Sequence, residues 1–119
     1  MGNFNQLLVW QKSVDFAVQI YQKTARFPDD EDYGLRGQLR RAAASIPTNL
    51  AEGQGRSTRL DYRRFVIHAR GSAFEIQTNL ILCQRIGYLS SEDATALRSR
   101  IDEIARMLNG LIAYLTPSA

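Results

Sequence analysis

Residues 58–86 read TRLDYRRFVIHARGSAFEIQTNLILCQRI, the longest stretch of the chain with an unbroken helical pattern. Intervals of four and three residues alternate through three heptads of this stretch and predict a single helix. The positions that follow this spacing are Tyr62, Val66, Ala69, Ala73, Ile76, Leu80 and Cys83. They share one face, as in the seam between helices of a bundle. Gly87 follows and is expected to end the helix.

Similar patterns on either side predict three more helices, and no strand-type alternation competes with them. Phe27-Pro28 is expected to end the first, because the residue before a proline disfavours the α conformation. Ser90, with Asp93 three positions later, is typical of the cap that begins the last. Short loops between amphipathic helices predict an all-α fold, an antiparallel up-down four-helix bundle that forms one domain over residues 1–119. The four helices are expected at residues 10–27, 35–52, 58–86 and 90–115.

Pro47 lies in the middle of the second predicted helix. A proline there removes the hydrogen bond to the carbonyl of Ala43 and crowds that carbonyl. We therefore expect Pro47 to kink or break the helix. The alternative is a pair of shorter helices that meet at Pro47.

The segment from Arg36 to Arg70 is strongly basic. It holds eight basic and two acidic residues, a balance of +6, whereas the rest of the chain holds seven basic and ten acidic residues, a balance of −3. This asymmetry favours a polyanion or an acidic protein as a partner. The alternative is an ordinary solvated surface with internal ion pairs. The arginines expected to contact phosphates are Arg36, Arg40, Arg41, Arg56, Arg59, Arg63 and Arg70.

Few aromatic residues alternate with these arginines, which argues against a platform that stacks the bases of a single strand.

The third predicted helix also carries a second apolar seam, in which Ile67, Phe74, Ile81 and Tyr88 recur every seven residues. Around the axis of this helix, the second seam lies at nearly the same angle as Arg56, Arg59, Arg63 and Arg70, provided that the helix begins early enough to include Arg56. Other helices of the same chain could cover this seam, or it could be an interface between subunits.

The residues that usually carry catalysis are scarce. His68 is the only histidine and Cys83 the only cysteine, and fifteen positions on one helix separate them by about 22 Å. No metal-ligand spacing and no phosphate-binding loop is present. We therefore expect no enzyme, no cofactor and no metal; the enzyme alternative requires a concave pocket that holds Glu52, Tyr62 or His68. A single cysteine and the lack of a membrane span or signal segment predict a cytoplasmic protein.

The middle of the chain also carries a distinctive set of short motifs. They are Tyr33-Gly34-Leu35, Gln38-Leu39-Arg40-Arg41-Ala42-Ala43, Ser45-Ile46-Pro47, Asn49-Leu50-Ala51-Glu52-Gly53 and Gly55-Arg56. Further motifs are Trp10-Gln11-Lys12, Ile20-Tyr21, Phe27-Pro28, Arg64-Phe65, Gly71-Ser72 with Glu75, and Gly87-Tyr88-Leu89. From about Leu7 to Leu115 the chain resembles the 23S rRNA intervening-sequence protein family, whose members are also called four-helix bundle proteins.

The resemblance implies a small antiparallel bundle that assembles as a homopentamer around a central channel. Some members are encoded inside intervening sequences of bacterial 23S rRNA genes, and many others lie elsewhere in genomes, so the family name does not establish a link to the ribosome. The related accessory proteins of diversity-generating retroelements look like the same pentamer and associate with nucleic acid and a reverse transcriptase. No catalytic residues come with the family.

Residues and resemblance together predict a non-enzymatic homo-oligomer that binds RNA or DNA through its arginines. Fivefold repetition would turn one basic segment into a ring of arginines. The resemblance also adds weight to the second seam as a subunit interface, because a ring needs two different faces on each subunit. The alternative is a scaffold or adaptor for a partner protein, without a direct role in binding nucleic acid. No membrane partner is expected.

Overall fold

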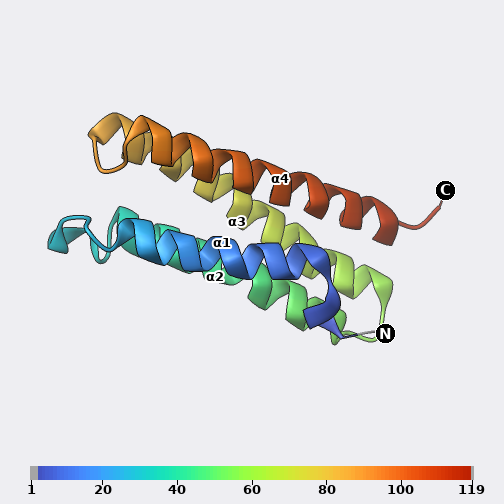
Figure 1. Ribbon diagram of the computed structural model, residues 1–119. Helices are drawn as coiled ribbons and strands as arrows, with labels where there is room; N and C mark the ends of the chain where they lie inside the picture. The colour runs from blue at the N-terminus through green and yellow to red at the C-terminus, as the bar shows by residue number, and fades with distance from the viewer. Residues whose placement is uncertain (1–2, 119) are drawn as a thin grey trace.

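A computed structural model describes residues 3–118 of the chain, and these residues form a bundle of four long helices (Figure 1). The elements are η1 (Phe4–Gln6), α1 (Leu8–Thr24), η2 (Asp29–Glu31), α2 (Leu35–Gln54), α3 (Arg59–Ile86) and α4 (Ser91–Leu115), of which η1 and η2 are short 3₁₀ helices. Successive α-helices run in opposite directions, and the described residues contain no strand. The prediction of an antiparallel four-helix bundle is therefore confirmed.

The ends of α3 and α4 follow the predicted caps. The Thr58 hydroxyl accepts a hydrogen bond from the backbone N–H of Asp61 at 3.1 Å, and the Ser90 hydroxyl accepts one from Asp93 at 3.0 Å. Each bond satisfies a backbone donor that has no partner inside its helix. Gly87 ends α3 with φ at 96°, a left-handed conformation that favours glycine.

Helix α1 ends at Thr24, three positions before the predicted end. Beyond it, the chain turns through η2, and side chains from α2 satisfy backbone carbonyls near the end of α1. The guanidinium group of Arg36 donates to the carbonyls of Thr24 and Phe27, and that of Arg40 donates to the carbonyl of Tyr21. The prediction for this boundary missed a tertiary contact that local sequence does not encode.

Helix α2 runs through Pro47 as one helix, so the predicted break and the alternative of two shorter helices are both wrong. Ile46 and Leu50 are fully buried on either side of the proline, and their packing holds both halves of α2 against the core. The carbonyls just before Pro47 also receive side-chain donors. The Thr48 hydroxyl donates to the carbonyl of Ala44, and the Asn49 amide donates to that of Ser45.

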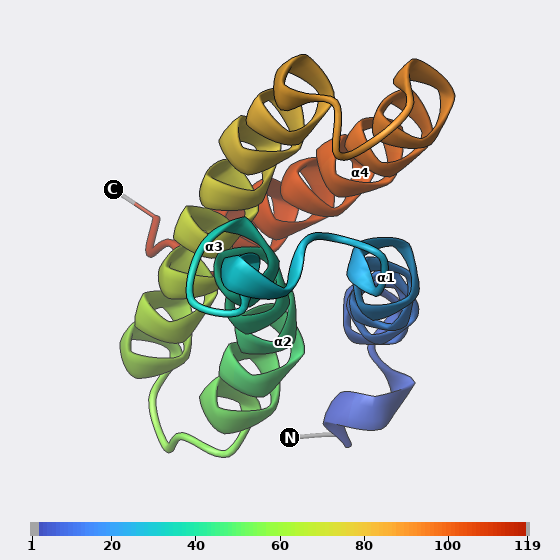
Figure 2. The ribbon, with the colours of Figure 1, turned by 90° about the vertical axis from the view of Figure 1, so that its left-hand side faces the viewer.

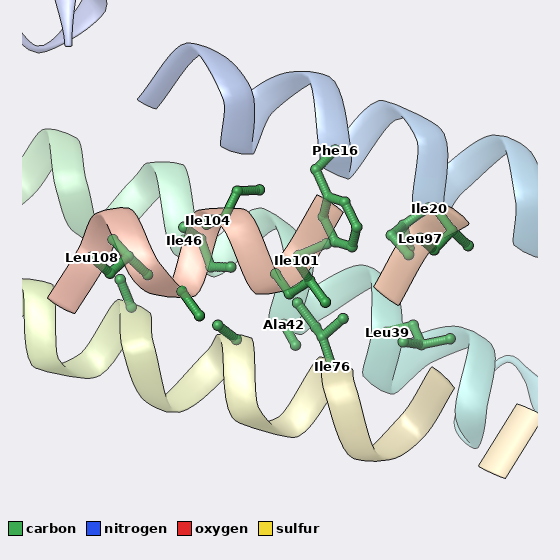
Figure 3. Close-up of a cluster of buried hydrophobic side chains, with 14 of the residues drawn as sticks. Phe16, Ile20, Leu39, Ala42, Ile46, Ile76, Leu97, Ile101, Ile104 and Leu108 are labelled. Atoms are coloured by element: carbon green, nitrogen blue, oxygen red, sulfur yellow. The ribbon is translucent and has the colours of Figure 1, made fainter. Parts of the chain in front are cut away.

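Side chains from all four α-helices meet in one core (Figure 3). The seam predicted on α3 is buried along its full length, from Tyr62 to Cys83. Opposite it, α4 contributes Leu97, Ile101 and Leu108. The apolar spacing therefore located the core correctly.

The two central helices are α2 and α3, while α1 and α4 lie outside them and contact each other less than the other neighbouring pairs of helices do (Figure 2). A pocket of about 360 Å³, lined in part by Asp15 and Arg100, lies between α1 and α4. Lys12 and Glu103 form an ion pair there at 2.5 Å. None of the described helices combines the length and the hydropathy needed to cross a bilayer.

Candidate nucleic-acid interface

The arginines expected to contact phosphates form two separate groups, one near each end of α2 (Figure 1). One group, Arg36, Arg40 and Arg41, lies on the first turns of α2, beside the end of α1. The other consists of Arg56, Arg59, Arg63 and Arg70; it starts where α3 begins and α4 ends, and extends along α3 to Arg70. The fifteen positions between Arg41 and Arg56 correspond to about 22 Å along a helix axis. One short ligand cannot reach all seven arginines of a single chain.

Arg36 does not fit the predicted role, because it is buried and all three of its guanidinium nitrogens form hydrogen bonds inside the fold. Only 7% of its surface is exposed. Its Nε donates to the carbonyl of Thr24 at 3.0 Å, its Nη2 to the carbonyl of Phe27, and its Nη1 pairs with Asp32 at 2.5 Å. Arg36 therefore fastens the end of α1 to the start of α2, and we remove it from the phosphate-contacting set.

Arg40 and Arg41 differ in how firmly the fold holds them. Arg40 donates to the hydroxyl of Thr24 and to the carbonyl of Tyr21, both at 3.0 Å, and its guanidinium carbon lies 4.6 Å from the centre of the Tyr21 ring. Arg41 is exposed and lines a pocket of about 270 Å³ between α2 and α3, to which Glu75 also contributes. Of these two, Arg41 is the more exposed.

The arginines on α3 reach across to the C-terminal half of α4. Arg59 donates to the carbonyl of Tyr114 at 2.5 Å, and Arg63 donates to the hydroxyl of Thr116 at 2.8 Å. Arg70 donates to the side-chain oxygen of Asn109 at 3.0 Å. Cations are favourable near the C-terminus of a helix, where the carbonyls carry partial negative charge. These contacts hold three guanidinium groups along one edge of the α3–α4 pair.

Arginine–aromatic contacts add aromatic side chains to this surface, and two of them, Phe65 and Tyr114, were not among the predicted site residues. The guanidinium carbon of Arg59 lies 4.7 Å from the centre of the Tyr114 ring, and that of Arg56 lies 4.6 Å from the centre of the Phe65 ring. Arg70 lies at 6.0 Å from Phe74. Tyr114 is far from the arginines in sequence, and only the antiparallel pairing of α3 with α4 predicts their proximity.

Intramolecular ion pairs account for few of the arginines in the basic segment. Among the residues that the structure describes, acidic partners are recorded for Arg36, with Asp32, and for Arg64, whose Nη1 lies 4.0 Å from an oxygen of Asp61. The other arginines bond to neutral acceptors, stack on aromatic rings or project into solvent. Internal ion pairing within one chain therefore does not explain the basic segment.

The second seam of α3 is partly used by the chain's own fold. Ile67 and Tyr88 pack against the core, and the hydroxyl of Tyr88 donates to the carboxylate of Glu31 at 2.7 Å. The same bond lowers the pKa of Glu31 and raises that of Tyr88. Ile81 is half-buried, while Phe74 is 50% exposed. Phe74 is therefore the member of the seam that remains most open.

Neither described pocket is lined by the residues that the enzyme alternative requires, namely Glu52, Tyr62 and His68. Burial raises the pKa of Tyr62 and raises that of Cys83 to about 11, which disfavours the reactive thiolate. Within residues 3–118, no group of three or more histidine, cysteine, aspartate or glutamate side chains is placed to hold a metal ion.

Comparison with known proteins gives a family but no activity. No curated protein matches the chain. A solved structure that is similar to it is described as a protein with unknown function from the S23 ribosomal protein family from Bacteroides thetaiotaomicron. The two share 26% sequence identity with a TM-score of 0.79, over 88% of this chain and 98% of the other. The model of the 23S rRNA-intervening sequence protein family matches residues 5–110, so the chain belongs to that family.

Proposed function

We propose that the protein is a non-enzymatic homo-oligomer, a pentamer in its assembled form, that binds nucleic acid through arginines on its surface. The observation that carries the proposal is the edge between α3 and α4. Arg59, Arg63 and Arg70 lie there with no acidic partner among the described residues, each bonded to a neutral acceptor. A guanidinium group has five N–H donors, so each of these arginines keeps several for phosphate oxygens.

Assembly strengthens this surface. A single edge with three arginines binds a polyanion weakly at physiological salt, because each contact is exposed and screened. Five copies in a ring present the same edge five times, and a long strand that reaches a second copy meets a high effective concentration of binding sites. The binding is expected to depend on phosphate contacts and little on base sequence.

Direct binding to a labelled RNA or DNA tests the proposal at low salt. Changing Arg59 and Arg63 to glutamate should weaken the affinity at least about tenfold, because it removes two phosphate contacts and adds repulsion. Changing Arg26 and Arg85 to glutamate makes the same charge change at the opposite end of the bundle, where both arginines are exposed, and serves as the control. No binding by the parent protein, or an equal loss in both variants, would contradict the proposal.

A second candidate function is a scaffold for a partner protein, and the exposed apolar side chains of α3 favour it. Phe74, Leu82 and Ile86 are 50%, 43% and 55% exposed. An apolar face of this kind suits a protein partner better than a phosphate backbone. A pull-down in which one partner stays bound after nuclease treatment, and is lost from a Leu82→Asp variant, would favour the scaffold over nucleic-acid binding.

A further inference from the structure

An exposed tyrosine lies within the basic edge of the α3–α4 pair. Tyr114 is on the last turn of α4, and 68% of its surface is exposed. The guanidinium group of Arg59 lies over its ring. We propose that Tyr114, with Arg59 and Arg63 beside it, forms a stacking site for a base of single-stranded RNA or DNA. This inference rests on the proposed function and names the class of nucleic acid that the edge binds.

The arginines around Tyr114 are held in place before any ligand arrives. Arg59 bonds to the backbone carbonyl of Tyr114, and Arg63 bonds through Nε to the hydroxyl of Thr116. That hydroxyl in turn donates to the carbonyl of Ile112 at 2.7 Å, which fixes its position at the end of α4. Side chains ordered in advance lose less entropy on binding. The site therefore offers oriented donors for a phosphate next to an aromatic surface for a base.

A single strand fits this arrangement better than a duplex. In a duplex the bases are stacked inside and the protein edge would meet chiefly phosphates, whereas an unpaired base can lie flat on a tyrosine ring. Arg59 already lies over one face of the ring in a cation–π contact, so the base would stack on the opposite face. Tyr114 would thus contribute to binding only when the bases are unpaired.

The sequence pattern argued against a stacking site, because few aromatic residues alternate with the arginines. The objection fails because it considered neighbours along the chain only. Arg59 and the carbonyl of Tyr114 are 55 positions apart in sequence and bonded in the fold. The antiparallel pairing of α3 and α4 supplies the aromatic ring that the basic segment lacks.

The edge is also long enough for several nucleotides. Arg59 and Arg70 are eleven positions apart on α3, about 17 Å along its axis. A strand as compact as one in a duplex, with one phosphate about every 3.4 Å along the axis, would place about five phosphates over that length, and a more extended single strand would place fewer. The base at Tyr114 would then lie at one end of the bound segment, with Arg70 at the other.

Fluorescence anisotropy with labelled twenty-nucleotide probes tests the proposal. The probes are single-stranded RNA, single-stranded DNA and a DNA duplex, each titrated with the parent protein, Tyr114→Ala, Tyr114→Phe and Tyr33→Ala. Tyr33 is 91% exposed and far from the α3–α4 edge, so its variant controls for the loss of any surface tyrosine. We expect Tyr114→Ala to bind both single strands about fivefold or more weakly, with Tyr114→Phe close to the parent. Duplex binding should change less than about twofold, because it depends on phosphate contacts.

Each other outcome overturns a defined part of the account. If Tyr114→Ala binds single strands as the parent does, or loses affinity for the duplex equally, the stacking site is wrong and the proposed function stands. If the parent binds none of the probes at low salt, the proposed function is wrong and the stacking site is wrong with it. If Tyr114→Ala loses affinity for single-stranded RNA alone, or for single-stranded DNA alone, the claim that the site accepts either kind of strand is wrong.

Discussion

Arg36 has the charge that a phosphate-binding residue needs, but its role in the fold is structural. Its charge and its place among other arginines predicted a phosphate contact, but its side chain is buried against carbonyls at the end of α1. Nothing in its immediate sequence distinguishes it from Arg40 or Arg41. The distinction comes from where α1 ends and how α2 packs on it, which is tertiary information.

Removing Arg36 should therefore affect stability more than binding. Arg36→Ala leaves the carbonyls of Thr24 and Phe27 without their donor, and we expect it to lower the free energy of unfolding by about 2–4 kcal/mol. Arg41→Ala, at an exposed position on the same helix, should change it by less than about 0.5 kcal/mol. Urea denaturation followed by circular dichroism compares the two. Equal, small effects would show that Arg36 is not structural.

The bond between Tyr88 and Glu31 predicts a dependence of stability on acid. The hydrogen bond from Tyr88 and that from the backbone N–H of Leu35 lower the pKa of Glu31 below 4.5. A carboxylate with a lowered pKa in the folded state stabilises the fold above pH 4.5, and this contribution is lost as pH falls through the lower value. The pKa of Glu103 is also lowered, chiefly by a hydrogen bond with Lys12, so it adds to the same trend.

Thermal melts between pH 3 and pH 7 should distinguish the contribution of Glu31 to stability from that of Glu103. The melting temperature of the parent is expected to fall on acidification below about pH 4.5, and that of Glu31→Gln should fall less steeply because one of the two titrating groups is gone. A Glu31→Gln profile parallel to that of the parent would show that the bond to Tyr88 does not stabilise the fold.

Among the elements, the helices and their caps could be predicted, whereas the end of α1 and the path of α2 could not. Apolar spacing and cap residues are local signals, and they located α3 and α4 to within one residue. The path through Pro47 depends on the burial of Ile46 and Leu50 against other helices. The same holds for the candidate site. Its arginines could be predicted from the sequence, but Tyr114 could not, because the pairing of α3 with α4 brings it next to them.

Packing between α2 and α3 predicts different effects for two glycines. A Cβ atom at Gly53 would lie 2.8 Å from a ring carbon of Tyr62 and 3.0 Å from the Cβ of Phe65. Gly53→Ala should therefore destabilise the fold by about 1–3 kcal/mol. Gly110, in the interior of α4, has nothing within 4 Å of such a Cβ, and Gly110→Ala should stabilise the fold by about 0.5–1 kcal/mol.

Chemical denaturation of the two alanine variants checks this difference in sign. The substitution is chemically the same in both, so helix propensity alone predicts stabilisation in each. If Gly53→Ala is also stabilising, α2 and α3 do not approach as closely at this point as the structure indicates.

In a single chain, several apolar side chains of α3 stay exposed, and Phe74 is the one that belongs to the predicted second seam. Phe74 is half-exposed in a single chain, whereas the neighbouring seam residue Leu80 is fully buried. We expect Phe74→Asp to dissociate the oligomer without unfolding the helices, and Leu80→Asp to unfold the chain. Light scattering gives the mass and circular dichroism the helical content. An oligomer of unchanged mass in Phe74→Asp, or a parent that is a monomer at micromolar concentration, would contradict this part of the proposal.

The proposed nucleic-acid surface is a property of the oligomer more than of one chain. Each subunit presents a short basic edge, and its net charge is only +3. Affinity must then come from several electrostatic contacts that act together, and such binding is sensitive to salt. Salt dependence is therefore a more direct probe of the mechanism than affinity at one condition.

The measurement that tests this most directly is the affinity for a single-stranded oligonucleotide as a function of salt concentration. The account predicts a straight line of log K against log salt with a slope of about −2 or steeper, since at least three phosphates are contacted and each contributes about −0.7. With Arg59 and Arg63 changed to glutamate, the slope should be flatter by about 1.4. No binding by the parent at low salt, or an affinity that does not change with salt, would contradict the account.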